Sequence, residues 1–532
     1  MKRNWNHIIL MSSATVSFNL LPKARSFSVV ARNSLVSLLT EPSLIQQEPH
    51  SSVEHDGGVF LVFDPAFPDS VLAEVPVQND QDARNAIERC HNALPSWRDD
   101  TTAMYRASLL TKWSTLMQEN AKDLATIMTL ESGKPLAESR GEVQYARSFL
   151  DYFAAEAVRA TGAGGGFMVP TPFQQSNGAT SPKGHIMAVQ QAVGVSAMIA
   201  PWNFPLAMIT RKVGPALAAG CTAVAKPSEL TPLSAVALKN LADRAGIPPG
   251  VFELITASRD TTAAVGTEFC TNPLVKKISF TGSTRVGKLL MRQASDTVKR
   301  VSMELGGNAV FVVFEDADVD QAVDAAMASK FRNAGQTCVC ADRFLVHNSV
   351  HDEFTTKLSA NVRMLRVGPG IQAGTQMGPL ISAGAKISVS EKVSAALDDG
   401  AILFEQMTLS DRLGPQFFPP TILTNVSPKS DIWKTETFGP VVAIRSFETE
   451  EEALEIANNC SVGLASYFCT NDLSRAFRFS HKLEAGMVGV NEGIMSTAVA
   501  PFGGLKESGV GTEGSHLGIK EYLETKYIFM NA

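Results

Sequence analysis

The stretch 193–296 alternates short apolar runs with longer amphipathic segments, and this alternation constrains the fold more than any other feature. The expected strands lie at 193–201, 221–228, 251–257 and 275–283, and the expected helices at 205–220, 231–246 and 284–296. Strands separated by helices of this length pair in parallel through right-handed crossovers. We therefore predict an α/β fold with a doubly wound sheet.

A second α/β unit is predicted to begin near 308–335, where a run of apolar residues leads into a helical pattern, and to continue to about Ala500. At 532 residues and 57.0 kDa the chain is too long for one ordinary core. Two or three domains are therefore expected, with an α/β unit in each half of the chain.

The charge balance argues against two classes of partner. A formal net charge of -6 and a pI near 5.9 give no general attraction to nucleic acid or to an acidic membrane surface. The uncharged run 193–210 has the length of a membrane span, but Pro201, Asn203 and Pro205 interrupt it. Neither nucleic-acid binding nor membrane insertion is expected.

The N-terminal residues differ from the rest of the chain. They are basic and rich in serine, and no Asp or Glu precedes Glu41. This composition is typical of an organelle transit peptide, so residues 1–45 are predicted to lie outside the fold and to direct the chain to the mitochondrial matrix, or to a plastid. A basic, disordered tail without a targeting role is the alternative.

The motif GQTCVC (335–340) places two of the seven cysteines one residue apart. This spacing does not suit a zinc site, so no metal is expected. Cys338 is either an accessible nucleophile or an inert, buried small hydrophobe. The nearest downstream histidine, His347, lies beyond a predicted strand, which disfavours a papain-like Cys/His pair.

Two further segments follow predicted strands. The motif KPSE (226–229) lies at the carboxyl end of a parallel strand, where open α/β sheets bind ligands. The glycines of 282–287 precede a helix whose N-terminus can face a phosphate. A solvated turn and an ordinary strand-to-helix turn are the alternatives.

The segments APWNFP (200–205), KPSELTP (226–232), FTGSTRVG (280–287), MELGGNA (303–309), GQTCVC, ETFGPV (436–441) and PFGGLKESG (501–509) resemble the aldehyde dehydrogenase superfamily, over roughly residues 50–530. The resemblance implies two doubly wound domains and a small β oligomerisation element. It divides the chain into a cofactor-binding domain (46–180 and 193–304), a catalytic domain (305–500) and the oligomerisation element (181–192 and 501–532), and it implies a homodimer or homotetramer.

Within this resemblance, Cys338 is the nucleophile that attacks an aldehyde carbon. The amide of Asn203 and the Cys338 N–H hold the resulting oxyanion. Glu304 is the general base that opens the thioester with water. From the residues alone, Asn203 is equally a turn residue between prolines, and Glu304 a capping or salt-bridged acid.

The resemblance also implies a nicotinamide cofactor. The residues that it assigns to this cofactor are Trp202, Lys226, Ser228, Glu229, Gly282, Ser283, Glu436 and Phe438. A carboxylate at Glu229 repels a 2'-phosphate, which favours NAD over NADP. Trp202 is alternatively a core aromatic residue.

Three more residues point to the substrate. The chain looks most like the branch of the family that oxidises succinate semialdehyde, in which Arg211, Arg332 and Ser496 match the residues that bind the substrate. A guanidinium binds a carboxylate bidentately, which suits an aldehyde with an acidic far end. Glutarate semialdehyde, an aminoaldehyde, or a catalytically silent family member are the alternatives.

In the same branch, a cysteine at the position of Cys340 pairs reversibly with the nucleophile. The resemblance therefore implies a redox switch between Cys338 and Cys340, in which a strained ring is readily reduced. A buried small hydrophobe beside the nucleophile is the alternative for Cys340.

Overall fold

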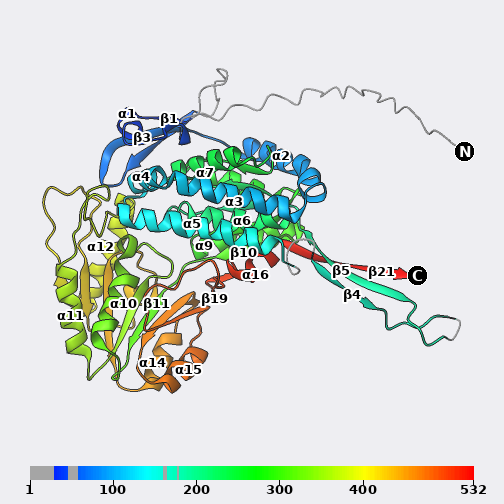
Figure 1. The fold of residues 1–532 in the computed structure, drawn as a ribbon. Coiled ribbons are helices and arrows are strands. Elements are labelled where there is room, and N and C mark those ends of the chain that lie inside the picture. Colours follow the sequence, from blue (N-terminus) through cyan, green and yellow to red (C-terminus); the bar gives the residue numbers. More distant parts are fainter. Residues whose placement is uncertain (1–28, 46–57, 160–164, 177–178, 532) are drawn as a thin grey trace, which may run out of the picture.

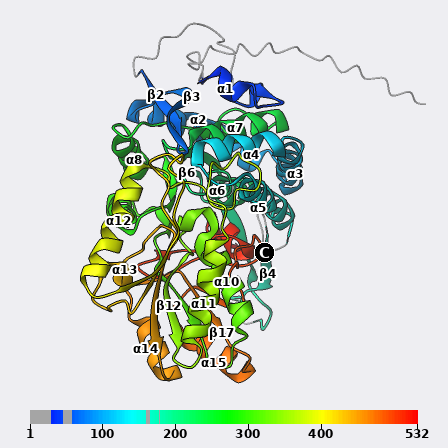
Figure 2. The same cartoon turned by 90° about the vertical axis from the view of Figure 1, so that its left-hand side faces the viewer.

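The computed structural model describes residues 29–45, 58–159, 165–176 and 179–531. Most of them belong to two bodies, each built from a sheet and the helices that cover it (Figures 1 and 2). Within these residues, no helix combines the length and the apolar character needed to cross a membrane.

A six-stranded sheet with the order β20-β10-β9-β6-β7-β8 forms the first body. Its strands are β6 (Val195–Ile199), β7 (Thr222–Lys226), β8 (Phe252–Leu254), β9 (Val275–Thr281), β10 (Arg300–Glu304) and β20 (Gly509–Val510). All of the pairs are parallel except β10 with β20. The doubly wound sheet predicted from 193–296 is confirmed, with strands shorter than expected because several of the quoted runs extend into turns.

Helices cover both faces of this sheet. One face packs against α2 (Asp80–Asp99), α8 (Thr262–Thr271) and α9 (Thr284–Ala294). The other face packs against helices that share the largest core cluster, and these helices are α3 (Ala103–Glu119), α4 (Ala121–Ser132), α5 (Leu136–Ala157), α6 (Ala207–Ala219) and α7 (Pro232–Ala245). The central strands β6 and β7 are buried along nearly their whole length because helices cover both faces of the sheet.

The second body contains a seven-stranded sheet with the order β13-β14-β15-β12-β11-β17-β18. Its strands are β11 (Ala309–Val313), β12 (Ala341–His347), β13 (Ile402–Gln406), β14 (Thr421–Thr424), β15 (Val441–Phe447), β17 (Ala465–Cys469) and β18 (Met487–Val490). Its helices are α10 (Val319–Phe331), η3 (Arg332–Gly335), α11 (His351–Arg363), α12 (Ala383–Asp398), α13 (Asp431–Lys434), α14 (Glu450–Asn458) and α15 (Leu473–Lys482). Only β13 runs antiparallel to its neighbour in this sheet.

Three strands form an arm that projects from the body and carries the C-terminal end of the chain (Figure 1). They are β4 (Gly166–Pro170), β5 (Gly184–Ala192) and β21 (Leu523–Asn531), in the order β21-β5-β4. The rest of the predicted element 501–532 lies elsewhere. It comprises β19 (Leu505–Lys506), β20 and α16 (Ser515–Lys520). Strand β19 pairs with β16 (Val462–Gly463).

The expected boundary at residue 45 differs from the structure. Residues 29–45 pack on the first body. Strand β1 (Val30–Ala31) joins β2 (Val59–Asp64) and β3 (Phe67–Pro76) in a small sheet. After β1 the chain forms α1 (Asn33–Val36) and η1 (Pro42–Leu44). Leu35, Leu44 and Ile45 are buried, and the carboxylate of Asp123 accepts the N–H groups of Thr40 and Glu41. Composition alone did not show these apolar anchors. Residues 1–28 of the predicted targeting segment lie outside the described residues.

Candidate active site

The loop that carries Cys338 connects α10 to β12. Asn333, Ala334 and Gly335 all have positive φ, and a Cβ on Gly335 would lie 2.2 Å from the carbonyl oxygen of Gly439. Only glycine tolerates that approach. The loop therefore bends sharply before Cys338, whose side chain is half-buried and free of any disulfide.

Asn203 reaches this loop from the other body. Its side-chain amide donates to the carbonyl oxygen of Gln336 at 3.1 Å, while its Oδ1 atom is buried and has no hydrogen-bond partner among the described residues. Asn333 in turn donates to the carbonyl oxygens of Asn203 and Gln336. The two segments that carry the predicted oxyanion donor and the predicted nucleophile are thus joined directly.

Glu304 ends strand β10 and is buried. Neither of its carboxylate oxygens has a hydrogen-bond partner within the described part of the chain. Burial raises the pKa of Glu304 well above its usual value, the nearby Glu513 adds to this, and Arg211 and Lys212 oppose it. A buried carboxylate with a raised pKa and free lone pairs is suited to accept a proton.

The thiol of Cys338 shares this electrostatic environment. Burial raises its pKa to about 12, the positive charge of Arg211 acts in the opposite direction, and Glu436 and Glu304 raise it further. The resting side chain is therefore a neutral thiol, and forming the thiolate requires a base or a compensating charge.

Arg211 lies on α6 and is fully buried. It forms an ion pair with Glu513, which also pairs with Lys212 and accepts from Ser279. The guanidinium lies 4.2 Å from the ring centroid of Phe502. One side of the guanidinium is thus matched by a carboxylate, while its Nη1 atom has no hydrogen-bond partner among the described residues. A role for Arg211 in substrate binding stays a prediction.

Arg332 and Ser496 line a cavity of about 280 Å³. The other lining residues are Lys134, Glu138, Gly141, Glu142, Tyr145, Phe204 and Ile494. The guanidinium of Arg332 lies 4.7 Å from the ring centroid of Phe204, which follows Asn203 in the chain. The cavity therefore adjoins the Asn203 loop, and Arg211 does not line it.

The charged residues of this cavity other than Arg332 were not predicted. Lys134, Glu138, Glu142 and Tyr145 come from the start of α5 and the segment before it. Glu138, Glu142 and Tyr145 lie on one face of α5, and Lys134 precedes the helix. The sequence alone did not distinguish that face from a solvated one, and the partner Glu513 was equally hidden because it lies about 300 positions from Arg211.

The predicted cofactor residues lie at strand ends. Lys226 ends β7, and its ammonium is 3.9 Å from the carboxylate of Glu229. Burial lowers the pKa of Lys226. Ser228 is buried, and its hydroxyl lies 3.5 Å from the Glu229 carboxylate. These side chains present hydrogen-bonding groups at the carboxyl edge of the sheet, where a ribose can bind.

The next strand offers an anion site. Gly282 and Ser283 follow β9, and Ser283 is the N-cap of α9 without a side-chain hydrogen bond to it. The first-turn N–H groups of α9 are therefore free of a side-chain cap. A helix N-terminus of this kind suits a pyrophosphate.

A third group faces this edge from the second body. The carboxylate of Glu436 accepts from the N–H of Gly307 at 3.2 Å, and burial raises its pKa to about 8. A Cβ on Gly306 would lie 2.9 Å from a carboxylate oxygen of Glu436, so a larger residue there would displace that side chain. The rings of Trp202 and Phe438 meet edge to face with centroids 5.6 Å apart. Together these groups fit a dinucleotide that bridges the two bodies.

Comparison with known proteins agrees with this arrangement. The model of the aldehyde dehydrogenase family matches residues 53–528, and the chain belongs to this family. It is 48% identical over 474 residues to the Escherichia coli succinate-semialdehyde dehydrogenase [NADP(+)] GabD, covering 89% of this chain and 95% of that protein. It is 47% identical to a Pseudomonas aeruginosa glutarate-semialdehyde dehydrogenase, covering 92% and 99%.

A solved structure shows the same fold. The crystal structure of a succinate-semialdehyde dehydrogenase from Burkholderia pseudomallei matches with a TM-score of 0.87 and 46% identity, covering 93% of this chain and 100% of that one. The predicted aldehyde dehydrogenase-like α/β fold is confirmed.

Proposed function

We propose that this aldehyde dehydrogenase oxidises succinate semialdehyde to succinate with NAD. The observation that carries the proposal is the cavity beside the Asn203 loop, in which Arg332 and Ser496 offer donors to the far end of an acidic aldehyde. A half-buried arginine binds a carboxylate more strongly than a fully solvent-exposed arginine does.

The chemistry begins at Cys338. Its thiolate adds to the aldehyde carbon, the C=O π electrons move to oxygen, and a thiohemiacetal oxyanion forms. The amide of Asn203 and the backbone N–H of Cys338 stabilise that oxyanion. The thiol first loses its proton to solvent, a step that the positive charge of Arg211 favours. The raised pKa of Glu304 suits the later removal of a proton from the water that opens the thioester.

Lys226, Glu229, the N-terminus of α9 and Glu436 would hold a nicotinamide cofactor, which would supply the hydride acceptor. Loss of hydride from carbon leaves a thioester on Cys338. Glu304 then takes a proton from water, and the oxygen of that water forms a bond to the thioester carbon. The carbon–sulfur bond breaks, which releases the carboxylic acid and the Cys338 thiolate.

The choice of NAD over NADP rests on Glu229. Its carboxylate lies beside Lys226, where a 2'-phosphate on the ribose would meet negative charge. The Escherichia coli relative carries NADP(+) in its name, so this preference is measured directly by comparing kcat/KM for the two cofactors.

The substrate is tested by NADH formation under reducing conditions. Succinate semialdehyde, glutarate semialdehyde, an uncharged aldehyde of similar length and an aminoaldehyde are compared. A strong preference for the acidic aldehydes supports the proposal. Equal turnover of uncharged or cationic aldehydes removes the substrate assignment, and no turnover of any of them favours a silent family member. One methylene is worth only about 1 to 3 kcal/mol, so glutarate semialdehyde is the nearest competitor.

We further propose that the chain forms a homodimer or homotetramer through the arm of β4, β5 and β21. Its strands expose Phe167, Met168 and Tyr527 by 63%, 60% and 61%, and β4 and β21 are edge strands of the arm. Exposed apolar edge strands favour pairing with another chain. Light scattering of the wild type and of a Phe167→Asp/Met168→Asp variant tests this, and an unchanged mass would contradict it.

Residues 1–28 are proposed to direct the protein to the mitochondrial matrix. Because residues 29–45 pack into the fold, processing is expected before Val29. N-terminal sequencing of the organellar protein tests this, and a mature chain that begins after Ile45 would contradict it.

A further inference from the structure

The segment between α4 and α5 places a buried cation beneath the loop that carries Asn203. The ammonium of Lys134, whose side chain is 1% exposed, donates to the carbonyl oxygen of Asn203 at 2.6 Å. It also lies 4.3 Å from the ring centroid of Phe204. Two successive residues of the loop are thus held by one side chain.

Glu142, which lies on α5, holds the residues of the loop that follow Pro205. Its Oε2 atom pairs with Lys134 at 2.5 Å, and its Oε1 atom accepts the N–H groups of Leu206 at 3.0 Å and Ala207 at 3.3 Å. The ion pair therefore contacts the loop on both sides of Pro205 and fixes the start of α6.

Fold stability is a weak reason for such a pair. Removing two charges from water costs several kcal/mol, and apolar replacements of buried pairs are often equally stable. Directed hydrogen bonds to a loop give a fixed geometry that apolar packing does not provide. This loop carries Asn203, whose side-chain amide donates to the carbonyl oxygen of Gln336, two residues before Cys338.

We propose that the Lys134–Glu142 ion pair positions the Asn203 amide for the oxyanion. This inference rests on the proposed function, because it assumes that Asn203 stabilises the thiohemiacetal. Lys134 and Glu142 are positioning residues: they act through Asn203 and not on the reacting atoms. A misplacement of about 1 Å at such a donor costs on the order of a hundredfold in rate.

The test is a double-mutant cycle on kcat for succinate semialdehyde. Lys134→Met is compared in the wild-type and Asn203→Ala backgrounds. We expect a loss of about tenfold or more in the wild-type background, a change of less than about twofold in the Asn203→Ala background, and an unchanged KM for the aldehyde.

Glu142→Gln is the second variant, because its amide oxygen still accepts the N–H groups of Leu206 and Ala207 while the charge facing Lys134 is lost. The same dependence on background is expected. Asp123→Asn is the matched control: Asp123 is also a buried carboxylate that accepts two backbone N–H groups, but it holds Thr40 and Glu41, far from the site. It should lower stability and leave kcat unchanged.

Three outcomes overturn the inference. Equal losses of kcat in both backgrounds show that the pair acts independently of Asn203. A raised KM for acidic aldehydes with unchanged kcat shows that Lys134, which lines the cavity, binds the substrate itself. Full turnover by Asn203→Ala removes the proposed oxyanion role and the inference with it, so the failure of the proposed function is recognised separately.

Discussion

Arg211 forms a buried ion pair with Glu513, whereas Arg332, which was expected to act beside it, lines the cavity. The Arg211–Glu513 ion pair lies close to Tyr145, which lines the cavity. Burial raises the pKa of Tyr145, and the positive charge of Arg211 lowers it by a smaller amount. The two arginines therefore have different surroundings: Arg211 pairs with a buried carboxylate, and Arg332 lines the cavity.

Arg332→Ala should weaken selectively the binding of acidic aldehydes. Loss of the guanidinium removes one charge-assisted contact, so KM for succinate semialdehyde should rise by about tenfold or more, while an uncharged aldehyde of similar length should change by less than about twofold. Steady-state kinetics with both aldehydes measures the ratio.

Arg211→Met is the comparison for that variant. Because it leaves Glu513 beside Lys212 alone, it should lower the thermal midpoint and slow both aldehydes alike. If Arg211→Met selectively impaired acidic aldehydes and Arg332→Ala did not, the assignment of the two arginines would be reversed.

The affinity for acidic aldehydes should fall as the pH rises through neutrality. Burial raises the pKa of Glu138 to about 7, and Lys134 and Arg332 lower it. Below that pH the carboxyl group is neutral; above it, a negative charge stands beside Arg332 and repels an acidic substrate. KM should therefore increase between about pH 6 and 8.

Glu138→Gln keeps an oxygen that can accept the N–H of Asn333, now bonded to the carboxylate at 2.8 Å, and removes the titration. Its KM profile should be flat over the same range. A wild-type profile that is flat, or a slope that persists in Glu138→Gln, would exclude Glu138 as the titrating group.

Cys340→Ala should retain turnover and abolish reversible inactivation by peroxide. In the structure both thiols are free, the Cys340 thiol donates to the carbonyl oxygen of Lys330 at 3.4 Å, and burial raises its pKa to about 12 despite Lys330. A disulfide with Cys338 thus requires the loop to rearrange, and the strained product is readily reduced. Inactivation of Cys340→Ala that dithiothreitol still reverses would defeat the switch.

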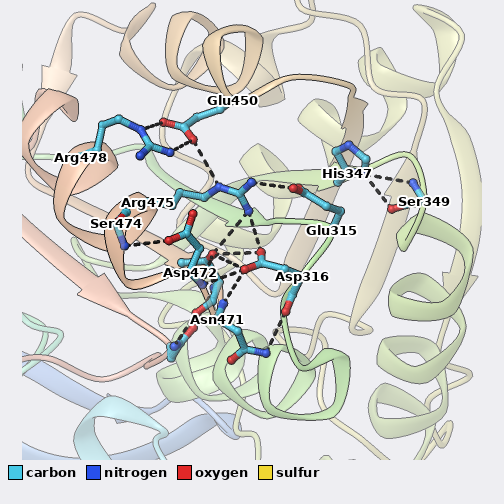
Figure 3. A network of polar contacts seen from close by, with 12 residues as sticks. Glu315, Asp316, His347, Ser349, Glu450, Asn471, Asp472, Ser474, Arg475 and Arg478 are labelled. Atoms are coloured by element: carbon cyan, nitrogen blue, oxygen red, sulfur yellow. Dashed lines mark hydrogen bonds and ion pairs between the residues drawn. The ribbon is translucent and has the colours of Figure 1, made fainter.

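Asp316 joins three elements of the second body, as Figure 3 shows. Its carboxylate accepts from Thr470 Oγ1, from the N–H groups of Asn471 and Asp472, and from Arg475 at 2.6 Å. Asp316→Ala leaves these donors unmatched, so we expect a loss of about 2 to 4 kcal/mol in the free energy of unfolding. Urea titration measures it.

The neighbouring Glu315→Gln is the control, because Glu315 pairs with Arg475 and is 41% exposed, which predicts a loss of about 0 to 1 kcal/mol. Burial acts to raise the pKa of Asp316, but the bonds from Thr470 and Asn471 leave it below its usual value. The stabilisation is therefore present above about pH 4 and lost as the pH falls through the lowered pKa. Equal losses in both variants would contradict this account.

The sequence predicted the local elements better than the long-range pairings. Apolar runs such as 222–226 specify strands buried on both faces, and the glycine and cysteine motifs mark the loops at their ends. The partner of Arg211 was not predictable, because Glu513 lies in a distant segment of the chain. Glu142 lies only eight positions from Lys134, but the sequence did not distinguish that helical face from a solvated one. The packing of 29–45 was missed because this apolar stretch was grouped with the basic, serine-rich residues before it, which concealed Leu35, Leu44 and Ile45.

The most direct test of the account is to identify the covalent intermediate on Cys338. Glu304→Gln protein is mixed with succinate semialdehyde and NAD, quenched in acid, digested and analysed by mass spectrometry. The account predicts one burst of NADH and a succinyl thioester on the peptide that contains Cys338, because without the base water does not open it. An acylated residue other than Cys338, or sustained turnover without any acyl-enzyme, would contradict the central claim.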